Sequence, residues 1–183
     1  MPRYAALLRG VNVGGHRAVP MADLRKLLEE LGYSDVATYL QSGNAVLTAD
    51  DEDPQRVTDT IRQGLARRMA VDADVLVRTG PELNAVIEDN PFADAVEQPT
   101  KLHVAFLATQ PDPADVAKVD PATYAPDEFR FGDRVVYLRY AVSAGRSKLG
   151  DGALARLGVV ATSRNWNTVL ALARMTEQNA ARP

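Results

Sequence analysis

The amino-acid sequence predicts an α+β protein made of two related lobes, each built on an antiparallel sheet. Its 183 residues are enough for one sizeable domain or two small ones. Short apolar runs typical of strands alternate with segments whose apolar residues recur at helical spacing. The order of strand, helix, hairpin, helix and strand occurs in the first half and returns in part in the second, which predicts a duplicated βαββαβ unit. The expected segments are a lobe at 1–80, a linker helix and loop at 81–100, a second lobe at 101–176 and a frayed tail at 177–183.

The first lobe is expected to begin with a buried strand at Tyr4–Leu8. This run is apolar on both faces, so it belongs at the centre of its sheet. A helix follows over Pro20–Leu31, since proline suits a first helical turn and the leucines form one apolar stripe. Two short strands, 36–40 and 45–48, flank the turn signal Ser42-Gly43-Asn44 and therefore predict a hairpin.

A second helix is expected directly after the hairpin. Asp53 can cap it and Pro54 suits its first position. The apolar residues of this helix recur every four positions, at Val57, Ile61, Leu65 and Met69. A fourth strand at 75–77 completes the unit. Right-handed crossovers then give a four-stranded antiparallel sheet with two helices on one face, which is the ferredoxin-like arrangement.

The second half predicts a partial repeat of this ferredoxin-like order. Gly132-Asp133 is a hairpin signal between two apolar runs. Ser163 is expected to cap a last helix. Arg164 and Asn165 would then lie in its first turn, and Trp166 would anchor it in the core. The expected helices are 81–88, 115–119, 149–157 and one from 163, and the expected strands are 102–107, 129–131, 135–140 and 159–161.

Composition and charge narrow the classes of function. The formal net charge is −3 and the pI is about 5.4, which disfavours broad binding to nucleic acid because such binding normally needs a basic face. No apolar run approaches the ~20 residues of a membrane span, and the N-terminus lacks a secretory h-region. Without cysteine, the chain has no disulfide or thiol chemistry. A cytoplasmic location without membrane contact is therefore expected.

Four polar motifs adjoin apolar runs and suggest a functional site. The first, Arg9-Gly10-Val11-Asn12-Val13-Gly14-Gly15, is a strand-to-helix loop with three glycines and a leading arginine. Glycine lets a ligand approach the backbone, and arginine presents donors suited to carboxylate or phosphate. Neither a Walker A nor a complete G-x-G-x-x-G pattern is present, so spacing alone favours a plain chain reversal. The other motifs are Gln41-Ser42-Gly43-Asn44, Gly145-Arg146-Ser147-Lys148 and Ser163-Arg164-Asn165-Trp166-Asn167-Thr168.

These motifs resemble the signatures of a known family, DUF1697. The N-terminal and C-terminal signatures are matched by Ala6–Gly15, Met21–Arg25, Gln41–Asn44, Gly145–Leu149 and Ala161–Val169. One departure is Tyr140-Ala141-Val142-Ser143, where the family pattern has a proline-containing lead into the turn. The resemblance implies an α+β architecture of duplicated ferredoxin-like character. It implies no catalytic residue, because the family is one of unknown function.

The four motifs predict a binding site more clearly than a reaction. A small anionic or nucleotide-like ligand is expected in a groove between the lobes, where the motifs would converge. The expected site residues are Arg9, Asn12, Gly14, Gly15, Ser42, Asn44, Arg146, Ser147, Lys148, Arg164 and Asn165. As a rival role, Arg9 or Arg164 would be buried and bonded to backbone carbonyls. Two alternatives remain open: a nucleic-acid-binding module, or a structural or partner-binding protein whose motifs determine the fold.

A catalytic role also remains open. Arginine, asparagine and lysine can stabilise phosphoryl or carboxylate charge, but no nucleophile or general base stands out. His16 in the glycine-rich loop is a candidate acid or base, whereas His103 is expected in the core or on the face of a sheet. Neither histidine has a partner at a metal-ligand spacing, so no structural metal is predicted. The sequence assigns no cofactor and no oligomeric state.

Overall fold

The fold comes from a computed structural model that describes residues 1–15 and 17–177. The chain divides into two compact units. Unit 1 comprises Met1–Asn84 and Ala171–Pro183, and unit 2 comprises Ala85–Leu170. The predicted lobes 1–80 and 101–176 stay a prediction, because compactness alone does not show which segment folds by itself. Of the predicted tail, Glu177 ends a helix, and 178–183 lie outside the described residues.

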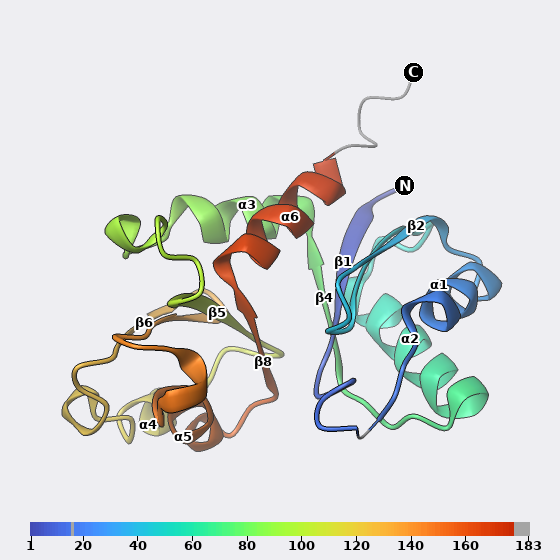
Figure 1. The fold of residues 1–183 in the computed structure, drawn as a ribbon. Coiled ribbons are helices and arrows are strands. Elements are labelled where there is room, and N and C mark those ends of the chain that lie inside the picture. The colour runs from blue at the N-terminus through green and yellow to red at the C-terminus, as the bar shows by residue number, and fades with distance from the viewer. Residues whose placement is uncertain (16, 178–183) are drawn as a thin grey trace. The chain divides into compact units, whose positions relative to one another are not determined.

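Unit 1 contains a four-stranded antiparallel sheet with two helices on one face (Figure 1). The strand order is β2-β3-β1-β4, so β1 lies between two neighbours, as its two buried faces predict. The elements are β1 (Arg3–Leu8), α1 (Met21–Glu30), β2 (Ser34–Tyr39), β3 (Asn44–Thr48), α2 (Pro54–Met69) and β4 (Val75–Thr79).

The core of unit 1 follows from the period of each element. Tyr4, Ala6 and Leu8, which alternate along β1, belong to the hydrophobic cluster that α1 and α2 complete. Helix α2 begins as expected: Pro54 takes its first position, and Asp53 Oδ1 accepts a hydrogen bond from Gln55 N–H at 2.9 Å. No helix among the described residues is long and apolar enough to cross a membrane.

Unit 2 contains a second antiparallel sheet whose strand order, β6-β7-β5-β8, repeats that of the first. The predicted class, α+β with two βαββαβ-type units, is therefore confirmed. The repeat is complete in its strands and reduced in its helices, since α4 and α5 have four and six residues, against ten and 16 in α1 and α2. The elements are β5 (Leu102–Leu107), α4 (Pro113–Val116), β6 (Glu128–Gly132), β7 (Val135–Arg139), α5 (Leu149–Leu154) and β8 (Ala161–Asn165).

Aromatic side chains support the sheet of unit 2 where its helices are short. The rings of Tyr124 and Phe129 lie 6.2 Å apart, and those of Phe129 and Phe131 lie 5.7 Å apart, both edge to face. All three pack in the cluster that contains Ala105 and Leu107 of β5. Large rings thus supply apolar volume that longer helices supply in unit 1. The remaining helical segments are α3 (Gly80–Glu88), α6 (Trp166–Glu177) and short 3₁₀ turns at Ala93–Ala95, Pro121–Thr123, Ala144–Arg146 and Ala155–Leu157.

The last strand and helix differ from the prediction. β8 extends through Asn165, so Ser163 does not cap a helix, and Arg164 lies in a strand rather than a first helical turn. The expected strand at 159–161 shares only its last residue with β8. Asn165 caps α6 instead, since its Oδ1 accepts a hydrogen bond from Thr168 N–H at 2.9 Å. Trp166 is 3% exposed, which confirms it as a core residue.

Candidate functional site

Asn12 ties the first polar motif to the second. Its side-chain Nδ2 donates hydrogen bonds to Val19 O at 2.9 Å and to Gln41 O at 2.7 Å, while Oδ1 accepts one from Val19 N–H at 2.7 Å. Its own N–H donates to Arg17 O at 3.1 Å and closes the loop on itself. We call residues 9–15 and 17 the glycine loop. These four bonds make the glycine loop a defined structure rather than a slack connection.

Gly43 brings the second motif against the end of β1. Leu8 N–H donates to Gly43 O at 2.8 Å, and Gly43 has a φ of +76°. A Cβ at Gly43 would lie 2.5 Å from Val11 Cγ2 and 2.8 Å from Leu8 Cβ, closer than real Cβ atoms approach. Glycine is therefore required here for both conformation and space.

Asn44 and Ser42 shape the turn of the second motif. Asn44 is fully buried, and its Nδ2 donates to Tyr39 O at 3.0 Å and to Ser42 Oγ at 2.9 Å. Ser42 itself is exposed. Of these two predicted site residues, Asn44 supports the turn from within and Ser42 faces solvent.

Two arginines bring positive charge to the glycine loop. Arg9 Nη1 lies 3.2 Å from Asp74 Oδ2, and its side chain remains 53% exposed. Arg17 Nη1 lies 3.8 Å from the position of a Cβ on Gly10, so its guanidinium lies over the loop backbone. Within the described residues Arg17 makes no ion pair. Two guanidinium groups and one carboxylate leave a formal charge of +1. Sequence reasoning missed Arg17 and Asp74, although the expected pairing of the first and fourth strands brings Arg9 to Asp74.

Gly14 and Gly15 present open backbone in the same loop. Both are exposed, with φ values of +59° and +77°, and nothing lies within 4 Å of the position of a Cβ on either. The requirement for glycine at these two positions is therefore conformational rather than steric. His16, the candidate acid or base, lies outside the described residues.

The third motif is held by Asp127. Its carboxylate accepts hydrogen bonds from Ala141 N–H at 2.7 Å and from Ser147 Oγ, and Ser147 Oγ accepts one from Leu149 N–H at 2.9 Å. Asp127 thus fixes the segment that leads into the turn of the third motif. The hydroxyl of Ser147 therefore binds the first residue of α5, Leu149. Arg146 and Lys148 are exposed.

Arg164, in the fourth motif, is buried in β8. It is 7% exposed, and its Nη1 donates to Thr162 Oγ1 at 2.8 Å and to Ser163 O at 2.9 Å. Burial lowers the pKa of Arg164 to about 10, which leaves the guanidinium charged at neutral pH. The rival role, a buried arginine bonded to a backbone carbonyl, is thus found for Arg164 and not for Arg9.

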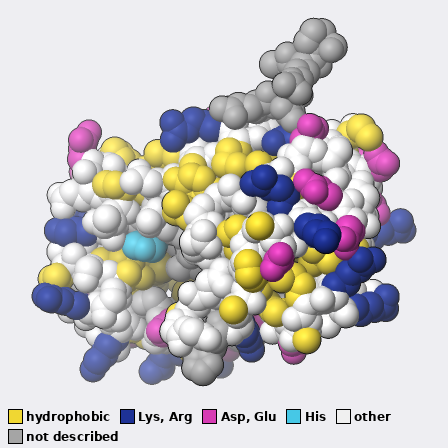
Figure 2. Space-filling view, turned by 45° about the vertical axis from the view of Figure 1, so that its right-hand side comes forward, with side chains coloured by type: hydrophobic (Ala, Val, Ile, Leu, Met, Phe, Trp, Pro, Cys, Tyr) yellow, Lys and Arg dark blue, Asp and Glu magenta, His cyan; other side chains and the backbone are white. Residues whose placement is uncertain are grey.

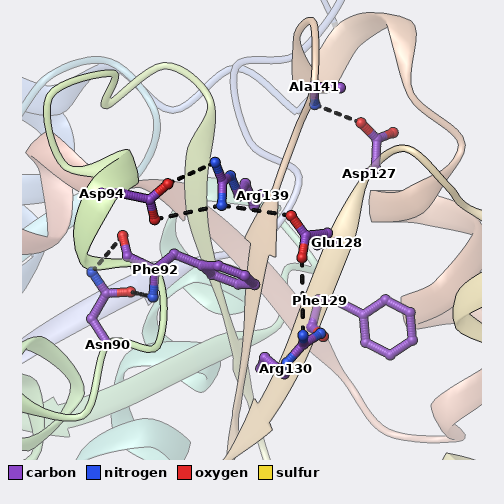
Figure 3. A network of polar contacts seen from close by, with 9 residues as sticks. All are labelled: Asn90, Phe92, Asp94, Asp127, Glu128, Phe129, Arg130, Arg139 and Ala141. Carbon is purple, nitrogen blue, oxygen red and sulfur yellow. Dashed lines mark hydrogen bonds and ion pairs between the residues drawn. The ribbon is translucent and has the colours of Figure 1, made fainter.

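A second polar network in unit 2 contains none of the predicted site residues. Arg139 Nη2 lies 2.8 Å from Asp94 Oδ2 and Arg139 Nη1 lies 3.5 Å from Glu128 Oε1 (Figure 3). The guanidinium carbons of Arg139 and Arg130 lie 5.8 and 5.7 Å from the centre of the Phe92 ring. Neighbouring charges thus hold Arg139 in an ordered surface network.

Two cavities lie away from the predicted residues. One, of about 170 Å³, is lined in unit 2 by Lys101, Gln98 and Arg139 among others. The other, of about 540 Å³, lies between α1 and α2, with Leu27 and Met69 in its lining. Figure 2 turns the side with α1 and α2 forward and shows hydrophobic side chains gathered among charged ones. None of the eleven predicted site residues lines either cavity.

His103 lies on β5 as expected, where its side chain is half-buried. Its ring lies 5.2 Å from that of Tyr140, edge to face, and its Nδ1 is buried without a hydrogen-bond partner among the described residues. Burial lowers the pKa of His103 below its ordinary value. Burial, and then the charges of Asp127 and Asp151, raise the pKa of Tyr140 to about 12. In the described ranges no three His, Asp or Glu side chains are placed to hold a metal ion.

The two antiparallel sheets, whose strands follow the same order, define an α+β protein with duplicated ferredoxin-like units. The first unit carries the glycine loop that Asn12 holds in place. Residues 1–137 match the family described as "Protein of unknown function (DUF1697)", and the chain belongs to this family. The matched range contains the first two motifs, whereas the third and fourth lie beyond it.

A solved structure shares this fold. It is described as "The structure of conserved bacterial protein SP0830 from Streptococcus pneumoniae" and aligns with a TM-score of 0.74 over 96% of this chain and 98% of that one. The identity of 24% makes this a likeness of fold alone. No curated protein sequence matches the chain.

Proposed function

We propose that this protein binds a small anionic ligand, a phosphate or a carboxylate, at the glycine loop of unit 1. The observation that supports this most is the set of three side-chain hydrogen bonds made by Asn12. They hold an exposed glycine backbone beside Arg9 and Arg17. A loop that is already ordered avoids much of the entropy loss on binding.

The chemistry of the glycine loop suits an anion. Guanidinium groups donate paired hydrogen bonds to carboxylate and phosphate oxygens, and successive backbone N–H groups in positive-φ segments form anion-binding concavities. Asp74 holds Arg9 at 3.2 Å and fixes its direction, while Arg17 has no competing ion pair within the described residues. The formal charge of +1 therefore favours a negatively charged ligand.

The wider site of eleven residues, with a nucleotide-like ligand, stays a prediction. It joins residues of both units. Asn44, Ser147 and Asn165 make local hydrogen bonds, so we assign them support of their loops. Ser42, Arg146 and Lys148 are exposed at the surface and remain candidate contacts. Arg164 is buried and bonded to Thr162 and Ser163, so we assign it to the support of β8. The cytoplasmic location stays a prediction as well.

Thermal unfolding in the presence of inorganic phosphate, pyrophosphate and citrate tests this function. A ligand at 100 times its Kd should add ~2.7 kcal/mol of stability. Arg9→Ala and Arg17→Ala should each remove most of that gain. Arg25→Ala is the matched control, since Arg25 is exposed on α1 and outside the loop. No gain with any of these anions, or an equal gain in all variants, would contradict the proposed function.

A further inference from the structure

Two large hydrophobic side chains are exposed on the two loops that Asn12 joins. Val13 is 66% exposed and Leu40 is 56% exposed. Val13 follows Asn12 in the chain, and Leu40 precedes Gln41, whose carbonyl accepts the 2.7 Å hydrogen bond from Asn12. Each apolar side chain is therefore one residue away from the same hydrogen bond, next to the cationic glycine loop.

Leu40 also has an unusual backbone conformation. Its φ is +56°, which glycine and asparagine adopt readily and leucine does not. A single exposed apolar residue needs no explanation, and asparagine or glycine would fit this turn with less strain. A leucine kept both strained and exposed is instead consistent with a contact made by its side chain.

We propose that the ligand of the glycine loop is an anion that also carries an apolar ring, such as an aryl phosphate or a nucleoside phosphate. Arg9 and Arg17 would hold the charged group while Val13 and Leu40 contact the ring. This inference rests on the proposed function and names its ligand class. Two side chains are too small a surface for a protein partner, because a stable interface buries about 800 Å² on each side.

Inorganic phosphate and phenyl phosphate form the probe pair, because they share a charged group and differ by one ring. Calorimetric titration of the wild-type chain should show phenyl phosphate binding at least about tenfold tighter. Leu40→Asn removes the apolar side chain but suits the positive φ, and Val13→Thr keeps the size of the side chain. Each variant should weaken phenyl phosphate binding about threefold or more and so reduce the difference in affinity between the two probes.

Val142→Thr is the control, since Val142 is 60% exposed but lies in a loop of unit 2. Urea unfolding of each variant shows whether the fold is retained, and Val13→Thr decides alone if Leu40→Asn unfolds. Binding of neither probe would overturn the proposed function itself. If phosphate binds but phenyl phosphate binds no tighter, or if both loop variants keep the difference, only the inference about the ring is overturned.

Discussion

Arg78 and Arg164 occupy the same position in the two copies of the fold. Arg78 lies opposite Ala5 where β4 pairs with β1, and Arg164 lies opposite Val104 where β8 pairs with β5. They are 4% and 7% exposed, and each donates from Nη1 to the preceding carbonyl, Val77 O or Ser163 O, at 2.9 Å. Since a buried charge must keep its hydrogen bonds, both arginines act as determinants of the fold.

Because Arg164 is buried and Arg9 is exposed, we expect their substitutions to change stability by different amounts. Arg164→Ala should lower the free energy of unfolding by more than ~1.5 kcal/mol, because it removes hydrogen bonds from a charged donor. Arg9→Ala loses an exposed ion pair and should change stability by at most about 1 kcal/mol. Urea unfolding measures both. Equal losses would show that Arg9 is also a structural residue.

Asn12 should be sensitive even to an isosteric change. Asn12→Asp keeps the acceptor for Val19 N–H but replaces two donated hydrogen bonds with a carboxylate facing two carbonyls. The expected loss of stability is about 1–3 kcal/mol, together with loss of anion binding. Asn12→Gly is the control for backbone conformation, since glycine accepts the φ of 57°. A stable Asn12→Asp variant that still binds the anion would refute the role assigned to this side chain.

The glycines at 43 and 14 should respond differently to alanine. Gly43→Ala combines a positive φ with contacts of 2.5 and 2.8 Å, so we expect a loss of about 2–5 kcal/mol, the sum of overpacking and left-handed strain. Gly14→Ala introduces left-handed backbone strain without a steric clash, so its expected loss of stability is about 1–2 kcal/mol. The two losses are compared by urea unfolding. Similar values would mean that Gly43 is not held against β1 as described.

His103 should make stability depend on pH. Burial lowers its folded-state pKa below the ordinary value of 6.5, so the unfolded chain takes up a proton while the folded ring stays neutral. The contribution of His103 is therefore complete above pH 6.5 and is lost as the pH falls from 6.5 towards the folded pKa. Urea unfolding between pH 8 and pH 5 should show a shallower decline in His103→Gln. Identical slopes would contradict the burial of a neutral ring.

Local patterns in the sequence were sufficient for most of the fold. The period of apolar residues in Met21–Glu30, the cap and proline at 53 and 54, and the Gly132-Asp133 turn each depend on residues close in the chain. These signals predicted both sheets and the central place of β1. They failed at β8, because Ser163, Arg164 and Asn165 are polar and suggest a helix start. Only pairing with β5, about 60 residues away, makes a strand of them.

The candidate site was less accessible to sequence reasoning. The motif Arg9–Gly15 was identified, yet its most connected side chain, Asn12, turned out to bond within the chain. Arg17 gave no motif signal, because its place over Gly10 depends on how the loop closes. The directions of the Asn12 and Arg17 side chains depend on the positive φ of both residues. A pattern of residue types does not predict that backbone conformation for non-glycine residues.

The most direct test of the central claim is an NMR titration of the backbone amides with inorganic phosphate. If the glycine loop binds anions, the amide signals of Gly14 and Gly15 should shift in a saturable way, and Arg17→Ala should remove the shifts. Signals from α1, which includes the exposed Arg25, should stay unchanged. The absence of any saturable shift in the glycine loop, or shifts of the same size in the Arg17→Ala variant, would contradict the account.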